Sequence, residues 1–358
     1  MKKTFAVLMS TLVCMTFAAG NARAEEYLLS LNLTIPPTHN RWVKAIKPWV
    51  EELEKRSGGR IKVEPYFAGA LSKQSEVMDS VRNGMADLGE AGYAVSIGNF
   101  LFHEQLMAVA TPSRYTQNTV DLIREMEKAF PKEAEKDWRG THYLFTHAAD
   151  AGMFIATRDK PVTSLDQLKG MKIGVSGGGV RAERARALGA TVVGIPTPDM
   201  YMSLEKGVID GVLVDVDLLI SRRIGEVVKH MTLLNMGGAC FYMTMSESAY
   251  DNLPDELKRV VDELSGDYAK TLFSSFWNNS IESSGKKWIS EMGGQFHVLP
   301  PEDYEKADKL LTDVDKQAWI GFLSDKGLPA EAMYQKFREL EKNYSVDIER
   351  SLLTTLGK

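Results

Sequence analysis

The stretch Met171–Pro196, MKIGVSGGGVRAERARALGATVVGIP, has the order that decides the fold. A short apolar run, MKIGV, predicts a strand, VRAERARAL predicts a helix, and TVVGIP predicts a second strand. A strand, a helix and a strand at this spacing form a right-handed βαβ unit, whose two strands lie parallel in one sheet. The sequence therefore predicts an α/β protein with mainly parallel sheets.

The glycines between the first strand and the helix raise the question of a phosphate-binding loop. A dinucleotide site needs an acidic residue at a strand end about 20 positions later. Asp199 lies at that distance but in the start of a predicted helix, and no G-x-x-x-x-G-K-[ST] motif occurs. We therefore expect no nucleotide cofactor. The glycines instead predict a turn that passes close to a partner lobe or to a small ligand.

The strand–helix alternation occurs twice, which predicts two lobes. It runs from Leu28 to Ala91 and starts again after Asp150. We assign residues 25–150 plus about 239–265 to lobe I, and residues 151–238 plus about 286–358 to lobe II. Residues 254–292 read as one long helix, interrupted only by Gly266 and Gly285, that bridges both lobes. The crossings between the lobes are predicted at residues 150–154 and 238–242.

The first 24 residues resemble a secretory signal peptide. Lys2 and Lys3 precede an apolar run over residues 5–19, and residues 22–24, Ala-Arg-Ala, match a cleavage site. Cleavage removes three basic residues and no acidic one, which changes the formal net charge from −5 to −8. We expect a periplasmic protein without nucleic-acid partners. No later run is apolar enough to span a membrane, so we expect no stable insertion of the mature chain.

Neither a metal site nor a catalytic constellation is predicted. Cys240 is the only cysteine after the signal peptide, so no internal disulfide forms. The six histidines show no metal-ligand spacing, and no G-x-S-x-G elbow occurs. We expect a protein that is not an enzyme and has no cofactor. A periplasmic hydrolase is kept as a remote alternative.

Two long blocks carry a resemblance to a known family. The first is residues 36–89, PPTHNRWVKAIKPWVEELEKRSGGRIKVEPYFAGALSKQSEVMDSVRNGMADLG. The second joins residues 160–175, KPVTSLDQLKGMKIGV, to 188–212, LGATVVGIPTPDMYMSLEKGVIDGV, and 226–232, EVVKHMT. Together they resemble the periplasmic solute-binding proteins of TRAP transporters, the DctP family. The resemblance implies a two-lobed fold of the periplasmic-binding-protein type, with crossing segments and a long bracing helix.

The resemblance also implies a function. A small ligand binds in the cleft between the lobes, and the closed receptor delivers it to the TRAP membrane permease subunits for ion-driven uptake. Most members bind a carboxylate through an arginine in the strand MKIGV, where this chain has Gly174. A second common arginine is matched by Phe154, and a common asparagine by Val214. The ligand predictions are therefore a small organic acid, aromatic acids included, or alternatively an amine, a zwitterion or a neutral polar molecule.

The predicted ligand-binding residues come from the segments that the resemblance places around the cleft. They are Glu90, Tyr93, Asp150, Phe154, Gly174, Ser176, Val214, Asp215 and Tyr242. Acidic and aromatic side chains in this set suit an amine or a zwitterion, although single carboxylates often face solvent or cap helices. For an acid ligand, a displaced arginine has to supply the guanidinium. The candidates for it are Arg41, Arg158, Arg181 and Arg184.

Overall fold

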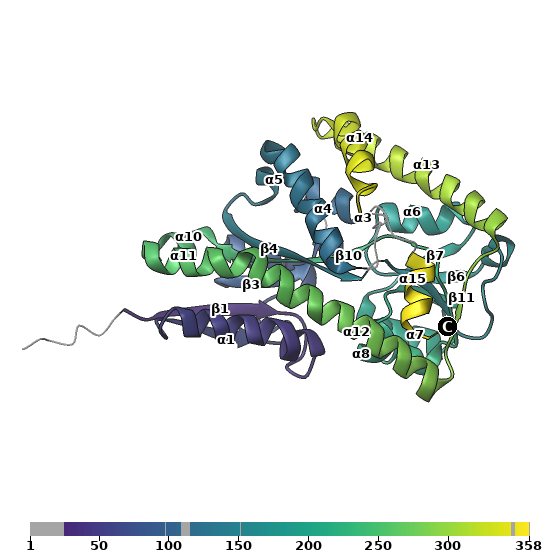
Figure 1. The fold of residues 1–358 in the computed structure, drawn as a ribbon, viewed down its shortest axis with the longest axis horizontal. Coiled ribbons are helices and arrows are strands. Elements are labelled where there is room, and N and C mark those ends of the chain that lie inside the picture. The colour runs from purple at the N-terminus through teal and green to yellow at the C-terminus, as the bar shows by residue number, and fades with distance from the viewer. Residues whose placement is uncertain (1–24, 97, 109–114, 151, 345–347, 358) are drawn as a thin grey trace, which may run out of the picture.

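Two β-sheets, one in each of two lobes, organise the chain (Figure 1). The structure is a computed structural model, and it describes residues 25–96, 98–108, 115–150, 152–344 and 348–357. The predicted signal peptide lies outside the described residues. In the described part of the chain, no helix combines the length and the apolar character needed to cross a membrane.

Lobe I contains a five-stranded sheet in the order β2-β1-β3-β10-β4. The strands are β1 (Tyr27–Leu33), β2 (Ile61–Tyr66), β3 (Leu88–Gly92), β4 (Thr141–Asp150) and β10 (Ala239–Ser246). The helices are α1 (Lys47–Arg56), α2 (Val77–Arg82), α3 (Phe102–Ala108), α4 (Thr116–Ala129), α5 (Pro131–Asp137), α10 (Glu247–Asp251) and α11 (Asp255–Glu263). In β1, Leu29, Leu31 and Leu33 alternate into the core shared with α1 and α11, because successive side chains of a strand point to opposite faces.

Lobe II contains a six-stranded sheet in the order β11-β9-β5-β8-β6-β7. Its strands are β5 (Phe154–Thr157), β6 (Lys172–Val175), β7 (Thr191–Gly194), β8 (Gly211–Val214), β9 (His230–Thr232) and β11 (Gln295–His297). Its shorter helices are α6 (Val180–Ala187), α7 (Met200–Glu205), α8 (Leu218–Ser221) and α9 (Ile224–Val227). The quoted stretch forms β6, α6 and β7, and the two strands pair in parallel as predicted.

Each sheet contains one strand that runs antiparallel to its neighbours, and in each case it is the first strand after the chain has crossed from the other lobe. β5 follows the crossing out of lobe I and runs antiparallel to β8 and β9. β10 follows the crossing back from lobe II and runs antiparallel to β3 and β4. The other pairings are parallel. The predicted α/β fold with mainly parallel sheets in two lobes is confirmed.

The two crossing segments lie against each other. The Met153 amide donates to the Gly237 carbonyl at 2.7 Å, and the Met236 amide donates to the Met153 carbonyl at 2.8 Å. Two backbone hydrogen bonds thus join the two chain segments between the lobes, which leaves few bonds to rearrange when the lobes rotate.

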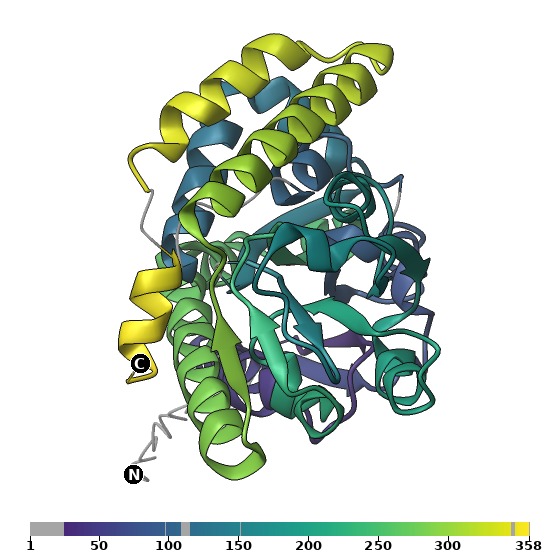
Figure 2. The same ribbon diagram turned by 90° about the vertical axis from the view of Figure 1, so that its right-hand side faces the viewer.

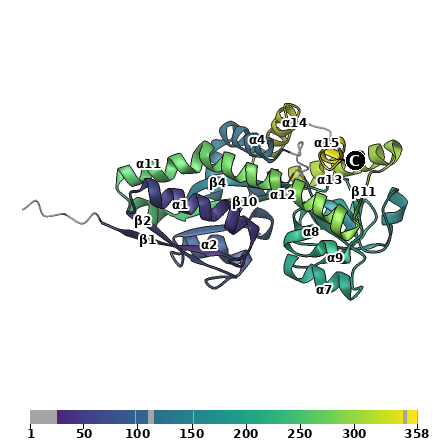
Figure 3. The same cartoon turned by 60° about the horizontal axis from the view of Figure 1, so that its bottom comes forward.

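A long helix, α12 (Ala269–Met292), joins the two lobes (Figure 3). Phe273 and Trp277 of its first half pack in a lobe I core, and Ile281 and Trp288 of its second half pack in a lobe II core. The helical run from Pro254 bends at Gly266, whose φ of −79° and ψ of −129° are not helical.

The helix continues unbroken through Gly285. A Cβ there would come within 2.7 Å of Leu356, so the glycine lets the C-terminal helix α15 (Ile348–Thr355) and its following residues pack close to α12. α12 therefore connects the lobe cores as one element, with its bend outside the bridging part.

The C-terminal helices cross between the lobes a further time (Figure 2). α13 (Pro301–Asp325) begins in a lobe II core with Leu311 and ends in a lobe I core with Trp319 and Leu323. α14 (Ala330–Glu341) also packs in lobe I, whereas we expected residues 286–358 to belong to lobe II. The difference arises because the apolar residues of α13 serve different cores along its length, which helical periodicity alone does not reveal.

Candidate functional site

A cavity between the lobes contains charged side chains from both of them. Lobe I contributes Arg41, and lobe II contributes Arg222 and Asp215. The cavity has a volume of about 110 Å³. At roughly 10–15 Å³ for each water-sized site, this volume suits a ligand of about ten non-hydrogen atoms. The site is therefore sized for a small molecule.

Arg41 is the cationic group of the lobe I wall. It lies directly before a π-helical turn, Trp42–Ile46, that leads into α1, and is 5% exposed. Its Nη2 donates to Glu90 Oε2 at 3.2 Å, and its Nε lies 3.1 Å from Glu90 Oε1. Its guanidinium carbon stacks 4.1 Å from the centre of the Phe241 ring. These contacts hold the guanidinium in place at the cavity wall.

Glu90 lies beneath this wall and is fully buried. Its other neighbour is His147, whose Nε2 lies 3.2 Å from Oε1. Burial raises the pKa of Glu90. The charges of Arg41 and His147 together lower this pKa by more than burial raises it, so the net shift is downward and the carboxylate stays ionised. Glu90 thus acts on the cavity through Arg41.

Arg222 follows the short helix α8 and brings a second guanidinium to the cavity from lobe II. It is half-buried, its buried Nε donates no hydrogen bond, and it has no ion-pair partner among the described residues. Burial lowers its pKa, and the nearby charge of Arg41 lowers it further. Two guanidinium groups from opposite lobes therefore face one small space, and an anion between them would offset their repulsion.

Of the predicted arginines, Arg181 also lines the cavity, but its donors are largely occupied. Nη1 donates to the Ser176 carbonyl at 3.3 Å, and Nη2 donates to the Gly238 carbonyl at 2.6 Å. Burial lowers its pKa to about 10, which leaves it charged at neutral pH. Arg181 thus ties α6 to the crossing segment.

Two other predicted arginines lie away from the cavity. Arg184 is paired with Asp315 of α13 in the interior, and Arg158 contacts Asp159 and the Leu204 carbonyl. Neither residue is among those that line the cavity. The guanidinium groups that face a ligand are thus Arg41, which the sequence suggested, and Arg222, which it did not.

Asp215 and Asp217 place two carboxylates at the start of α8. Both line the cavity. The Leu218 amide donates to Asp215 Oδ1 at 3.0 Å, and the Ser280 hydroxyl donates to Asp217 Oδ1. Burial, followed by the charge of Asp217, raises the pKa of Asp215 to about 7. The side chain therefore exchanges a proton near neutral pH.

The remaining walls are aromatic and apolar. Phe241 and Trp277 stack at 5.7 Å with their planes 12° apart. His39 accepts a hydrogen bond from the Arg41 amide at Nδ1, so its neutral ring carries the proton on Nε2. Burial and the charges of Arg41 and Arg222 lower the pKa of His39 to about 3.

The glycine turn after β6 closes the cavity against lobe I. Ser176 lines the cavity, and Gly177 adopts a positive φ of 78°. A Cβ on Gly177 would lie 2.9 Å from the Ala94 carbonyl oxygen of lobe I. Of the two explanations predicted for these glycines, the structure shows the close approach of the partner lobe.

Replacing Gly177 with alanine should weaken ligand binding by about tenfold, because the added methyl group meets Ala94 when the lobes close. Gly179 is the matched control, since it also has a positive φ, of 63°, and a Cβ there has nothing within 4 Å. Isothermal titration calorimetry on both variants measures the effect. Equal affinities for Gly177→Ala and Gly179→Ala would contradict a role of this contact in closure.

The structure places the predicted ligand-binding residues in three groups. Ser176 and Asp215 line the cavity, and Glu90 lies behind Arg41. The side chain of Asp150 lies outside the described residues. The others pack inside the lobes and are absent from the cavity lining: Tyr93, Phe154, Gly174, Val214 and Tyr242.

Packing explains why several of these residues lie inside the lobes. A Cβ on Gly174 would come within 2.7 Å of Ile209, so apolar side chains occupy the space beside this strand. Tyr93 donates or accepts a hydrogen bond with Thr146 at 2.5 Å, and Tyr242 does the same with Ser96 at 3.0 Å. Both hydroxyl groups thus have partners in lobe I.

Sequence reasoning missed part of the site. The missed cavity residues are His39, Asp217, Arg222, Phe241 and Trp277. Only Arg222 had a local signal, the pair of arginines after α8, and nothing in that pair distinguishes it from Arg223. The structure does so: Arg223 has a positive φ of 60°, is exposed and pairs with Glu226.

Comparison with known sequences identifies the family. The sequence model of the DctP family, described as "Bacterial extracellular solute-binding protein, family 7", matches residues 33–320. This chain belongs to that family. It is an extracellular-type solute-binding protein, in agreement with the resemblance seen in the sequence.

Individual relatives agree with this assignment. A solute-binding protein of Albidiferax ferrireducens is 27% identical over 248 residues, which cover 67% of this chain and 70% of that protein. The C4-dicarboxylate-binding periplasmic protein DctP of Rhodobacter capsulatus is 24% identical over 300 residues, covering 82% and 86%. This solute-binding protein thus matches its relatives over most of their length.

A solved structure matches the fold closely. It is a marine metagenome TRAP solute binding protein specific for aromatic acid ligands, from an unidentified microbe, in complex with metahydroxyphenylacetate. The TM-score is 0.81 at 26% identity, and the match covers 90% of this solute-binding protein and 100% of the other chain. The two-lobed receptor fold is therefore shared.

Proposed function

We propose that this receptor binds a small aromatic carboxylate in the cavity between its lobes. The observation that carries the proposal is Arg222, a half-buried guanidinium that lines the cavity and forms no ion pair among the described residues. A carboxylate supplies the missing partner, and guanidinium–carboxylate pairs are strong because both groups are charged and planar. The aromatic acid ligands of the marine relative and the stacked pair Phe241 and Trp277 support an aromatic ring.

Ligand binding favours closure because the two guanidinium groups belong to different lobes. A carboxylate between Arg41 and Arg222 contacts both lobes in the closed state and only one in the open state. The crossings at residues 150–154 and 238–242, and the assignment of the residues before 286 to lobes made from the sequence, stay predictions. The closed form is the one that we propose for delivery to the membrane.

The cellular setting follows from the family and the N-terminus. We propose that residues 1–24 are removed on export and that the mature receptor acts in the periplasm. There it delivers its ligand to TRAP membrane permease subunits for ion-driven uptake. The receptor role needs no catalysis, and recovery of the unchanged ligand from the complex by mass spectrometry distinguishes it from a hydrolase.

A thermal-shift screen tests the ligand class. Benzoate and related aromatic carboxylates should raise the melting temperature by several degrees. At 100 times Kd, binding stabilises the folded state by about 2.7 kcal/mol. Benzamide and benzylamine are matched controls that keep the ring and change the charge, and neither should stabilise the protein comparably. Stabilisation by amines or amino acids alone would contradict the proposal and favour the amine or zwitterion prediction.

A further inference from the structure

Asp215 is the cavity carboxylate without a cation of its own. It is 6% exposed and has no ion-pair partner among the described residues. The charges around it come from Arg41 of lobe I, Arg181 of α6 and Asp217 at the start of α8. Arg41 is bound to Glu90, and Arg181 is bound to two backbone carbonyls. The donors within the described residues are backbone amides, so a further donor for this carboxylate has to come from the cavity that it lines.

Backbone donors fix the carboxylate of Asp215 at the start of α8. Its Oδ1 accepts the hydrogen bond from the Leu218 amide, and the Asp217 amide also donates to the carboxylate. The residue lines the cavity, and a carboxylate has about four lone-pair sites, so it can accept a further hydrogen bond there. Asp215 therefore keeps acceptor capacity for a ligand in the cavity.

Asp215 and Arg222 stand at opposite ends of α8. The helix has four residues, Leu218–Ser221, with Asp215 before it and Arg222 after it. At 1.5 Å per residue the helix is about 6 Å long, a length comparable to a substituted benzene ring. A ligand whose carboxylate meets Arg222 can thus present a group on the far side of its ring to Asp215.

We infer that Asp215 selects aromatic acids that carry a ring hydroxyl group, which donates a hydrogen bond to its carboxylate. The inference rests on the proposed function and narrows its ligand class. A hydroxyl donor suits the site better than an ammonium group because Arg41, Arg181 and Arg222 also face the cavity, and a cationic ligand group would lie among them. Arg222 and Asp215 then recognise the two ends of one ligand.

The test compares benzoate with 3-hydroxybenzoate and 4-hydroxybenzoate by calorimetry at pH 8.5. At this pH Asp215, with its pKa of about 7, is ionised. The wild-type protein should bind the better hydroxybenzoate at least tenfold more tightly than benzoate, as expected for a hydrogen bond to a charged acceptor. In Asp215→Asn, which keeps an oxygen for the Leu218 amide, the preference should fall below threefold.

Asp166→Asn is the control. Asp166 is an exposed lobe II carboxylate that pairs with Lys169 and does not line the cavity, so the preference for the hydroxyl group should remain tenfold or more. The melting temperature of each unliganded variant shows whether α8 stays folded. If α8 is disrupted in Asp215→Asn, the variant Asp215→Ser, which keeps a side-chain oxygen to cap the helix, is used in its place.

Two results would overturn the inference while leaving the proposed function intact. One is equal affinity of the wild-type protein for benzoate and both hydroxybenzoates. The other is a hydroxyl preference that survives unchanged in Asp215→Asn. Failure of every carboxylate to bind would overturn the proposed function and this inference together, so the two failures are distinguishable.

Discussion

Replacing Arg222 with methionine should weaken the binding of an aromatic carboxylate by thirtyfold or more. The loss corresponds to about 2–5 kcal/mol, because the ligand carboxylate would enter a desolvated cavity with one of its two cations missing. The stability of the unliganded protein should change little, since Arg222 forms no ion pair among the described residues, and the repulsion by Arg41 and the attraction by Asp217 oppose each other. Calorimetry and thermal unfolding measure the two effects.

Arg223 provides the matched control for this experiment. It is the next residue in the chain, carries the same charge and pairs with Glu226 at the surface. Arg223→Met should leave the affinity within about twofold of the wild type, because exposed ion pairs contribute little. An affinity of Arg222→Met within threefold of the wild type would refute the assigned role of Arg222.

Arg41→Met affects both ligand binding and folding. The change removes one of the two cations that would face the ligand carboxylate, and it also leaves the buried Glu90 without its main partner. Breaking a buried ion pair in this way costs about 3–5 kcal/mol of folding stability. Arg41 is therefore a poorer probe of the ligand than Arg222, which forms no ion pair with a buried carboxylate among the described residues.

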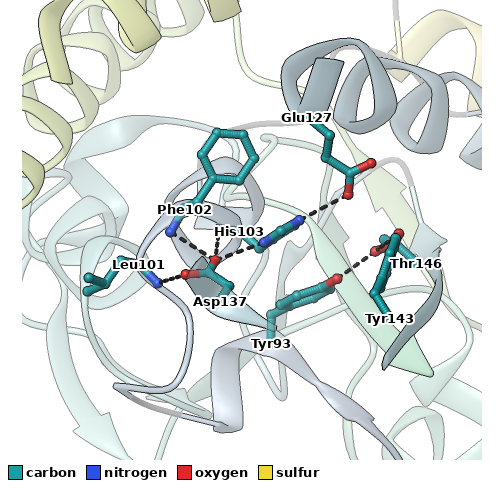
Figure 4. Close-up of polar contacts among 8 residues, drawn as sticks. All are labelled: Tyr93, Leu101, Phe102, His103, Glu127, Asp137, Tyr143 and Thr146. Carbon is teal, nitrogen blue, oxygen red and sulfur yellow. Dashed lines mark hydrogen bonds and ion pairs between the residues drawn. The ribbon is translucent and has the colours of Figure 1, made fainter. Parts of the chain in front are cut away.

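The second large effect concerns a buried cluster in lobe I, centred on His103 (Figure 4). Asp137 accepts hydrogen bonds from the amides of Leu101, Phe102 and His103 at 2.9–3.0 Å, and contacts the His103 ring at Nδ1 at 2.8 Å. The opposite ring nitrogen of His103 lies 3.0 Å from Glu127. The ring thus joins α3 to both α4 and α5.

This arrangement predicts a pH dependence of stability. Burial lowers the pKa of His103, but hydrogen bonds to Asp137 and Glu127 outweigh it and raise the pKa to about 9 from 6.5. Because the folded-state pKa exceeds the unfolded one, the contribution is fully present below pH 6.5. It is lost as the pH rises to 9 and above. It amounts to about 3 kcal/mol as an order of magnitude.

Urea unfolding of wild type and His103→Gln, followed from pH 6 to pH 10, tests this prediction. The difference in unfolding free energy between the two proteins should be largest at pH 6, fall steadily between pH 6.5 and pH 9, and be small above pH 9. His142→Gln is the control, because His142 is partly exposed and contacts Asp262 at the surface. A difference between wild type and His103→Gln that does not change with pH would mean that the His103 ring is neutral in the folded protein.

The sequence alone predicts the architecture because its signals are local. The order of strand, glycine turn, helix and strand at Met171–Pro196 sets a βαβ unit wherever it occurs, and its repetition gives two lobes. The bridging role of residues 254–292 could also be predicted, since a helix of that length exceeds one lobe. The path of α13 could not, because its apolar residues meet two different cores.

The site depends on contacts that no local pattern encodes. Arg41 meets Glu90, 49 positions away, because β1 and β3 pair side by side. Arg222 faces the cavity and Arg223 faces solvent, because the backbone at Arg223 has a positive φ of 60° just before α9 begins. The sequence by itself determined a two-lobed α/β receptor of this family. Only the tertiary structure decided which charges meet at the cavity, because that cavity is assembled from separate segments of both lobes whose side chains become neighbours only after packing.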